Sequence, residues 1–157
     1  MIRLALTKGR IEQKAVAILE ACGYDVSELR DKGRKLLLSF AIPYPTTKGG
    51  KAHWCREYGL NAYYAGKHWA RRRADAEYWH TLTRAHLPKA RMFKVPVIIT
   101  FCFNDNLDIS NHAAIAKMIE DAMKGRIIED DSRKYVIGHE YYFHDENFIR
   151  VTVRGAT

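Results

Sequence analysis

The sequence has no long hydrophobic run and few cysteines, and both absences limit where the protein can reside. No apolar stretch approaches the roughly 20 residues that a membrane-spanning helix needs. The opening MIRLALTKGR lacks the apolar core and small-residue cleavage site of a secretory signal peptide. The three cysteines, Cys22, Cys55 and Cys102, are far apart and form no CxxC pair. We therefore expect a cytoplasmic protein with reduced thiols and no contact with a membrane.

Several motifs of well-characterised enzyme classes are also missing. The seven histidines form no HExxH, and none lies at zinc-ligand spacing from a cysteine. No GxSxG and no helix-opening GxGxxG occurs, and the TTKGGK run at residues 46–51 lacks the glycine spacing and final GK[ST] of a P-loop. These absences argue against zinc hydrolases, serine hydrolases and common nucleotide-binding folds.

The charge of the chain is strongly segregated. The 157 residues are 47% hydrophobic and carry a net charge of +8, in the range of a soluble domain with its own core. Counting Lys, Arg, Asp and Glu gives +3 for residues 1–47, +8 for residues 48–94 and −3 for residues 95–157. A basic middle beside an acidic C-terminal third suggests a surface for a phosphate backbone next to a metal site.

Hydrophobic periodicity predicts an α+β fold with helices on one side of a mixed β-sheet. Strands are expected at residues 2–7, 35–44, 95–103, 135–143 and 148–153. Helices are expected at residues 11–22, stopped by Gly23, at residues 63–87, and from Ser110 or Asn111 to Met123. In the last of these, Ser110 or Asn111 is the expected N-cap, and the expected buried stripe is Ile115, Met118, Ile119 and Ala122. The last two strands read as a hairpin around residues 144–147, and residues 45–62 as a loop.

The helix expected at residues 63–87 carries both an apolar and a basic face. The residues predicted to pack on the sheet are Trp69, Ala76, Trp79, Leu82 and Leu87. Basic residues crowd its first turns, where they oppose the helix dipole by a few tenths of a kcal/mol each. That placement hints at an anionic partner, although a solvated helix face is an equally good interpretation.

The first 38 residues resemble the start of ATP phosphoribosyltransferase, the first enzyme of histidine biosynthesis. The matching pieces are Ile2-Arg3-Leu4-Ala5-Leu6, Lys8-Gly9-Arg10, Gly23-Tyr24-Asp25 and Arg34-Lys35-Leu36. Nothing later resembles the phosphoribosyl-diphosphate loop of that family. We interpret residues 1–39 as an N-terminal strand–helix extension without transferase activity, and residues 40–157 as the functional domain.

Acidic residues concentrate between Asp105 and Asp131, where seven of the eighteen Asp and Glu residues of the chain occur. They flank the helix expected to end at Met123, so folding could bring carboxylates from both ends of it together. Carboxylates in such a group are the oxygen ligands that Mg²⁺ prefers.

These residues resemble the RusA-like Holliday junction resolvases, nucleases common in phages and prophages. The pieces are Asp108-Ile109-Ser110-Asn111, Lys117, Asp121 and Asp130-Asp131, preceded by an Asn-x-Tyr segment at Asn61–Tyr63 and a first strand ending at Pro43 and Pro45. The likeness covers about residues 36–153. It implies a RusA-like fold and an endonuclease, dependent on Mg²⁺ or Mn²⁺, that acts as a homodimer on branched DNA in recombination and repair.

The resemblance also assigns roles to residues of this chain. Catalytic roles go to Asp108, Lys117 and Asp131. Metal ligands would be Asp108, Asp130 and Asp131, with Asp105 or Asp121 as a further candidate. DNA contacts would come from Asn61, Tyr64, Lys67, His68, Arg71, Arg72 and Arg73.

One departure from the family pattern leaves the activity open. Ser110 stands where the family usually has a second aspartate, and a serine hydroxyl is a weak metal ligand. The alternative is therefore a catalytically weak protein of the same fold that binds branched DNA. A truncated ATP phosphoribosyltransferase is a third, weaker hypothesis.

Overall fold

The apolar run VIITFCF builds the central strand of the sheet. In the computed structural model, which describes residues 10–23, 35–46 and 49–156, this run is β2 (Val97–Phe103). Six of its seven residues are buried, because β2 has a neighbouring strand on each side. The other strands of this four-stranded sheet are β1 (Leu36–Pro43), β3 (Val136–Phe143) and β4 (Phe148–Gly155). The α+β class and the mixed sheet are thus confirmed for the described residues.

The order of the strands is β1-β4-β2-β3, and it corrects the predicted hairpin. β3 pairs with β2 in parallel, and β4 pairs with β2 on the other side in antiparallel fashion. The predicted hairpin is wrong because β2 lies between the two strands that the short turn connects. A buried apolar strand needs partners for the hydrogen-bonding groups on both its edges, and this requirement overrides the local turn signal.

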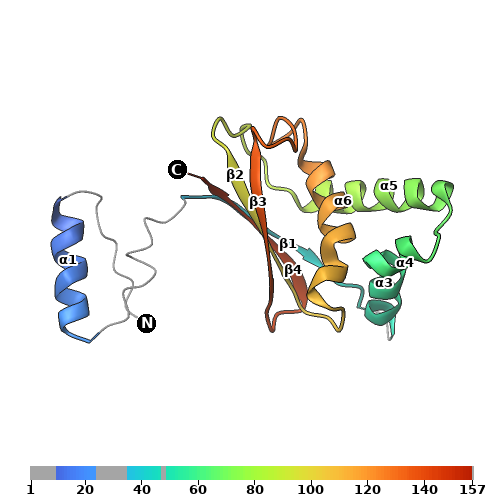
Figure 1. Ribbon diagram of the computed structural model, residues 1–157, viewed down its shortest axis with the longest axis horizontal. Coiled ribbons are helices and arrows are strands. Elements are labelled where there is room, and N and C mark those ends of the chain that lie inside the picture. Colours follow the sequence, from blue (N-terminus) through green and yellow to red (C-terminus); the bar gives the residue numbers. More distant parts are fainter. Residues whose placement is uncertain (1–9, 24–34, 47–48, 157) are drawn as a thin grey trace. The chain divides into compact units, whose positions relative to one another are not determined.

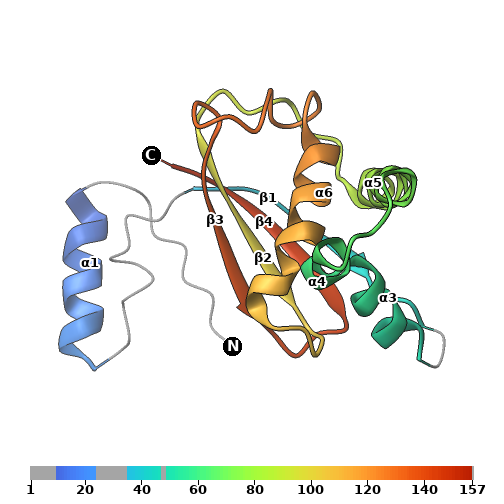
Figure 2. The same cartoon turned by 45° about the vertical axis from the view of Figure 1, so that its right-hand side comes forward.

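Helices α3 to α6 cover one face of the sheet (Figures 1 and 2). The 3₁₀ turn η1 (Ile109–His112) leads into α6 (Ala113–Met123), which connects β2 to the parallel strand β3. Helix α5 (Trp69–His86) packs on α6 and β1. Within the described residues, no helix combines the length and the apolar character needed to cross a membrane.

The apolar stripe of α6 is confirmed: Ile115, Met118, Ile119 and Ala122 are all buried. The predicted cap is not, because His112 occupies the N-cap position of α6 and no side chain caps it. The core also contains an aromatic group between α3 and α5, in which Trp54 and Trp79 stack with ring centroids 4.6 Å apart.

Two predictions for residues 45–87 are wrong. The expected loop contains α3 (Gly50–Tyr58), which buries Trp54 and Cys55, and it ends within α4 (Leu60–Tyr64). The expected long helix is interrupted at Gly66, whose φ of 87° favours glycine, and it resumes as α5. As a result Trp69 begins α5 with 70% of its surface exposed and does not pack on the sheet.

The chain divides into two compact units, Met1–Arg34 and Lys35–Thr157. The boundary falls before the predicted one after residue 39, since residues 36–39 belong to β1. The described part of the first unit is α1 (Arg10–Ala21) and its C-terminal turn, where Gly23 has a φ of 81°. That helix and its glycine stop agree with the sequence, whereas the strand expected at residues 2–7 lies outside the described residues.

Candidate functional site

The turn that follows α6 brings the acidic residues after the helix back to its side. Backbone N–H groups of Arg126, Ile127 and Ile128 all donate to the carbonyl oxygen of Met123, and Gly125 adopts a φ of 67°. Ile127 and Ile128 are then buried in the core. This tight reversal places Asp131 next to α6.

Lys117 is the centre of the resulting group of charges. Its Nζ lies 2.7 Å from Oδ1 of Asp121, one turn later on α6, and it also donates to Oδ2 of Asp131. The first contact has the i,i+4 spacing that the sequence indicates. The second joins residues 14 apart and depends on the turn. The structure therefore brings together Lys117, Asp121 and Asp131 as predicted.

A second lysine, Lys124, joins this group. Its Nζ lies 3.3 Å from Asp121, 3.3 Å from Asp131 and 3.9 Å from Asp130. Asp130 therefore lies at the edge of the group, because its described salt bridge is to Lys124 and not to Lys117. Sequence reasoning missed Lys124, although its position seven residues after Lys117 places both on one side of the helix.

The ionisation of these side chains is set by their mutual contacts. Partial burial alone would lower the pKa of Lys117, but its hydrogen bonds to Asp121 and Asp131 outweigh burial and raise the pKa above its usual value. The hydrogen bond from Lys117 holds the pKa of Asp131 well below its usual range. At neutral pH this contact therefore joins an ammonium and a carboxylate.

The group also contains a buried carboxylate that the sequence did not reveal. Glu120 is 2% exposed, and its Oε1 lies 3.2 Å from Nε2 of His139 on β3. Its other oxygen lies 3.9 Å from Nζ of Lys117. A glutamate among the apolar residues of α6 could have indicated a buried carboxylate. Its partner His139 could not be predicted, because residues of α6 and β3 meet only in the folded protein.

Asp108 and Ser110 lie at η1, and both are exposed. Asp108 occupies the N-cap position, where its Oδ2 accepts a 3.4 Å hydrogen bond from Nδ2 of Asn111 and its carbonyl oxygen accepts from the Asn111 N–H. Asn111 is 8% exposed, and its hydrogen bonds to Asp108 stabilise the turn and orient the Asp108 carboxylate. No described contact joins Asp108 to Lys117 or Asp131.

Asp105 has a different position from the one expected of a metal ligand. Its Oδ1 accepts from Nε2 of His112 at 2.9 Å and from the Leu107 N–H at 2.9 Å, while its Oδ2 accepts from Tyr44 at 2.8 Å. The carboxylate is 2% exposed, and the His112 ring stacks on Phe103. The hydrogen bonds of Asp105 thus stabilise the backbone segment that leads to Asp108.

We expect Asp105→Asn to lower the free energy of unfolding by about 2–3 kcal/mol at pH 7, since a buried charge accepting several hydrogen bonds is lost. Burial alone would raise the pKa of Asp105, but the bonds from His112, Leu107 and Tyr44 outweigh it and lower the pKa. This stabilisation is present above the unfolded-state pKa, about 3.9, and is lost as the pH falls through the lower folded-state value.

Urea unfolding of wild type and variant between pH 3 and pH 7 measures this difference, which should shrink towards the acidic end. The exposed Asp145 gives a matched control, because Asp145→Asn should change stability by about 0.5 kcal/mol or less. A constant difference at every pH would show that Asp105 is not the titrating group.

The donor set is suited to a hard divalent cation. Oxygens of Asp121 and Asp131 already converge on one positive charge, and Mg²⁺ is often held by one or two carboxylates with retained waters. Taken formally, the group of Glu120, Asp121, Asp130, Asp131, Lys117 and Lys124 carries two net negative charges. In the part of the chain that the structure describes, no three carboxylate, imidazole or thiolate side chains lie close enough to form a complete ligand set by themselves.

The residues expected to contact DNA fall into two classes. Tyr64, His68 and Arg71 are exposed, as are Asn61 and Arg73, although Arg73 lies 3.2 Å from Glu77. The ammonium of Lys67, in contrast, is buried against Glu57 and Asp75, at 2.7 and 2.5 Å. Arg72 donates to the carbonyl oxygens of Lys67 and Tyr63. Lys67 and Arg72 therefore hold the connection between α4 and α5 together, and Lys67 has no free face for a phosphate.

Comparison with known proteins gives a match to a short segment alone. No family model and no solved structure matches the chain. A stretch of 36 residues, 23% of the chain, is 67% identical to the ATP phosphoribosyltransferase of Clostridium acetobutylicum and 61% identical to that of Clostridium kluyveri. The enzyme of Listeria innocua is 56% identical over the same length. The chain spans about a sixth of the length of these relatives.

Proposed function

We propose that the protein is a metal-dependent endonuclease of the RusA-like type that cleaves branched DNA. The observation that carries this proposal is the contact of Asp121 and Asp131 with the same ammonium, that of Lys117. It gathers carboxylates from the last turns of α6 and from the turn after it into one group with an excess of negative charge. In a chain of net charge +8, such an acidic group is suited to bind a cation.

Each residue of the group has a separate task in this proposal. Asp131 and Asp121 would hold the ion, with Asp108 or Asp130 completing its ligands. A bound Mg²⁺ supplies a water of lowered pKa and neutralises charge on the scissile phosphate. Lys117, protonated at neutral pH, is suited to stabilise negative charge on the phosphate oxygens. The contact between His139 and Glu120 would stabilise the side of α6 that carries Lys117.

A homodimer fits this substrate. A four-way junction requires two cuts related by two-fold symmetry, and a C₂ dimer provides two identical sites. The exposed residues at the start of α5 would then track the phosphate backbone on both sides of the junction.

A second candidate function is binding of branched DNA without efficient cleavage. The feature that favours it is Ser110, which is exposed two residues after Asp108 and offers a hydroxyl where a carboxylate is expected from the resemblance. A truncated ATP phosphoribosyltransferase is a weaker candidate, because the match to that enzyme covers 23% of the chain.

One experiment separates cleavage from binding alone. Mg²⁺ or Mn²⁺ is titrated into wild type and Ser110→Asp on a labelled synthetic four-way junction, with gel analysis of the products. We expect metal-dependent cleavage by both, with half-maximal activity of Ser110→Asp at a metal concentration about tenfold lower, since even groups that only support a ligand change metal affinity by about this factor. Binding by both proteins without cleavage at any metal concentration would support the second candidate.

A further inference from the structure

Two large aromatic side chains are exposed on either side of the break between α4 and α5. Tyr64, the last residue of α4, is 80% exposed, and Trp69, the first residue of α5, is 70% exposed. These are the two highest exposures among the large hydrophobic residues that the structure describes. Among the other aromatic residues of this region, Trp54 and Trp79 are buried, and Tyr58 stacks on Tyr78, which is 42% exposed. The ring of Trp69 lies 5.5 Å from that of His68.

The backbone between the two rings is held in place. Gly66 makes the turn with a φ of 87°, and Lys67 anchors it to Glu57 and Asp75. His68 is the N-cap residue of α5, and its Nδ1 accepts a hydrogen bond from the Ala70 N–H at 3.3 Å. The exposure of Tyr64 and Trp69 therefore follows from a fixed turn in which both side chains are left outside the core.

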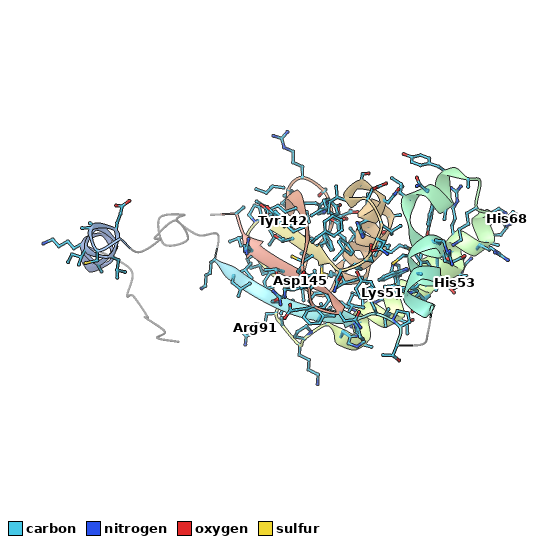
Figure 3. The ribbon with its side chains drawn as sticks, turned by 90° about the horizontal axis from the view of Figure 1, so that it is seen from below. Lys51, His53, His68, Arg91, Tyr142 and Asp145 are labelled. Atoms are coloured by element: carbon cyan, nitrogen blue, oxygen red, sulfur yellow. The ribbon has the colours of Figure 1, made fainter. Side chains whose placement is uncertain are left out.

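The surroundings of these rings are basic. Four Lys and Arg residues lie between Gly59 and Arg73. Lys67 and Arg73 pair with Glu57, Asp75 and Glu77, and Arg71 and Arg72 add two further positive charges. Arg71 is exposed two residues after Trp69, and the exposed His53 lies on the neighbouring α3, on the same helical side of the molecule as His68 (Figure 3). An apolar protein partner would not require this concentration of positive charge, whereas a nucleic acid has both phosphates and flat bases.

We infer that Tyr64 and Trp69 form a stacking platform for unpaired bases, with Arg71 contacting the adjoining backbone. Aromatic side chains stack on any base through its face, whereas paired bases in a duplex are already stacked on each other. The platform would therefore make the protein prefer DNA with unpaired bases, such as those at a branch point or a single-stranded tail. This inference rests on the proposed function, which supplies DNA as the partner.

The three tryptophans allow a direct test. Trp54 and Trp79 are buried, so quenching of fluorescence by a stacking base reports on Trp69. The full-length protein is titrated in EDTA with a thymidine 12-mer and with a 12-base-pair duplex. We expect saturable quenching by the single strand and little by the duplex.

Substitutions then separate the two rings. Trp69→Leu should remove the quenching and weaken single-strand binding about tenfold, the effect of losing one stacked base. Tyr64→Leu should weaken binding by a similar factor and keep the quenching, and Trp69→Phe should keep the affinity. Tyr142→Leu is the matched control, since Tyr142 is 54% exposed on β3 and lies away from His68 (Figure 3).

The outcomes distinguish this inference from the proposed function. Equal binding of the single strand by wild type and Trp69→Leu overturns the platform and leaves the nuclease proposal intact. A response of Trp69 to anionic lipid vesicles and not to DNA also overturns it. Quenching by the single strand without cleavage in Mg²⁺ supports the platform and overturns the nuclease, and binding of neither DNA overturns both.

Discussion

Asp131→Asn should abolish metal-dependent cleavage of a four-way junction while leaving junction binding intact. The substitution removes one of the two carboxylates that accept hydrogen bonds from Lys117 and replaces a charged oxygen by an amide. Groups that only support a metal ligand change affinity by about 10- to 100-fold, so losing a ligand should lower the cleavage rate by about 100-fold or more. Binding should persist because the basic surface at the start of α5 is untouched.

Cleavage rates at saturating Mg²⁺ and junction affinities in EDTA measure the two effects separately. Glu129→Gln is the matched control, since it removes one negative charge from the same exposed turn and should cleave like wild type. Lys117 is half exposed, so the loss of its partner should change stability little, which thermal unfolding can verify. Equal cleavage by Asp131→Asn and wild type would exclude Asp131 as a ligand.

Lys67→Ala should lower the free energy of unfolding by about 3–5 kcal/mol, because it leaves a buried carboxylate without its counter-charge. The side chains of Lys67 and Asp75 are 7% and 9% exposed, and their charged atoms lie 2.5 Å apart. Tyr63 donates to the same carboxylate at 3.2 Å, so the loss reaches a further hydrogen bond.

Guanidinium unfolding, followed by tryptophan fluorescence, measures this loss. Arg71→Ala is the control, because Arg71 is exposed in the same segment and should change stability by about 0.5 kcal/mol or less. The double variant Lys67→Met with Asp75→Asn removes both charges and keeps an acceptor for Tyr63, so it should recover part of the stability. A loss below about 1 kcal/mol in Lys67→Ala would contradict a structural role for the buried pair.

Local sequence patterns were sufficient for the elements whose formation depends on neighbouring residues. The apolar run of β2, the buried stripe of α6 and the glycine stop after α1 all follow from periodicity and backbone preference. The Lys117–Asp121 contact belongs to the same class, because residues four apart on a helix always share a face. These features needed no knowledge of the rest of the chain.

Other features could not be read from local patterns, since their causes lie far apart in the sequence. The sequence predicts a DNA contact for Lys67, yet its ammonium is buried against Asp75 and Glu57. The helical spacing of Trp69 predicts a core residue, but the helix is interrupted at Gly66 and the Trp69 side chain is exposed. The short turn between β3 and β4 predicts a hairpin, but β2 lies between these two strands in the sheet.

The sequence by itself therefore determined the composition of the candidate site: an acidic segment around a helix, with a basic segment before it. Beyond the Lys117–Asp121 pair, the tertiary structure decided which of these charges meet. Asp131 reaches Lys117 because the turn after Met123 reverses the chain, and His139 reaches Glu120 because β3 is placed beside β2. Contacts of this kind depend on packing between elements, and packing is a property of the whole core.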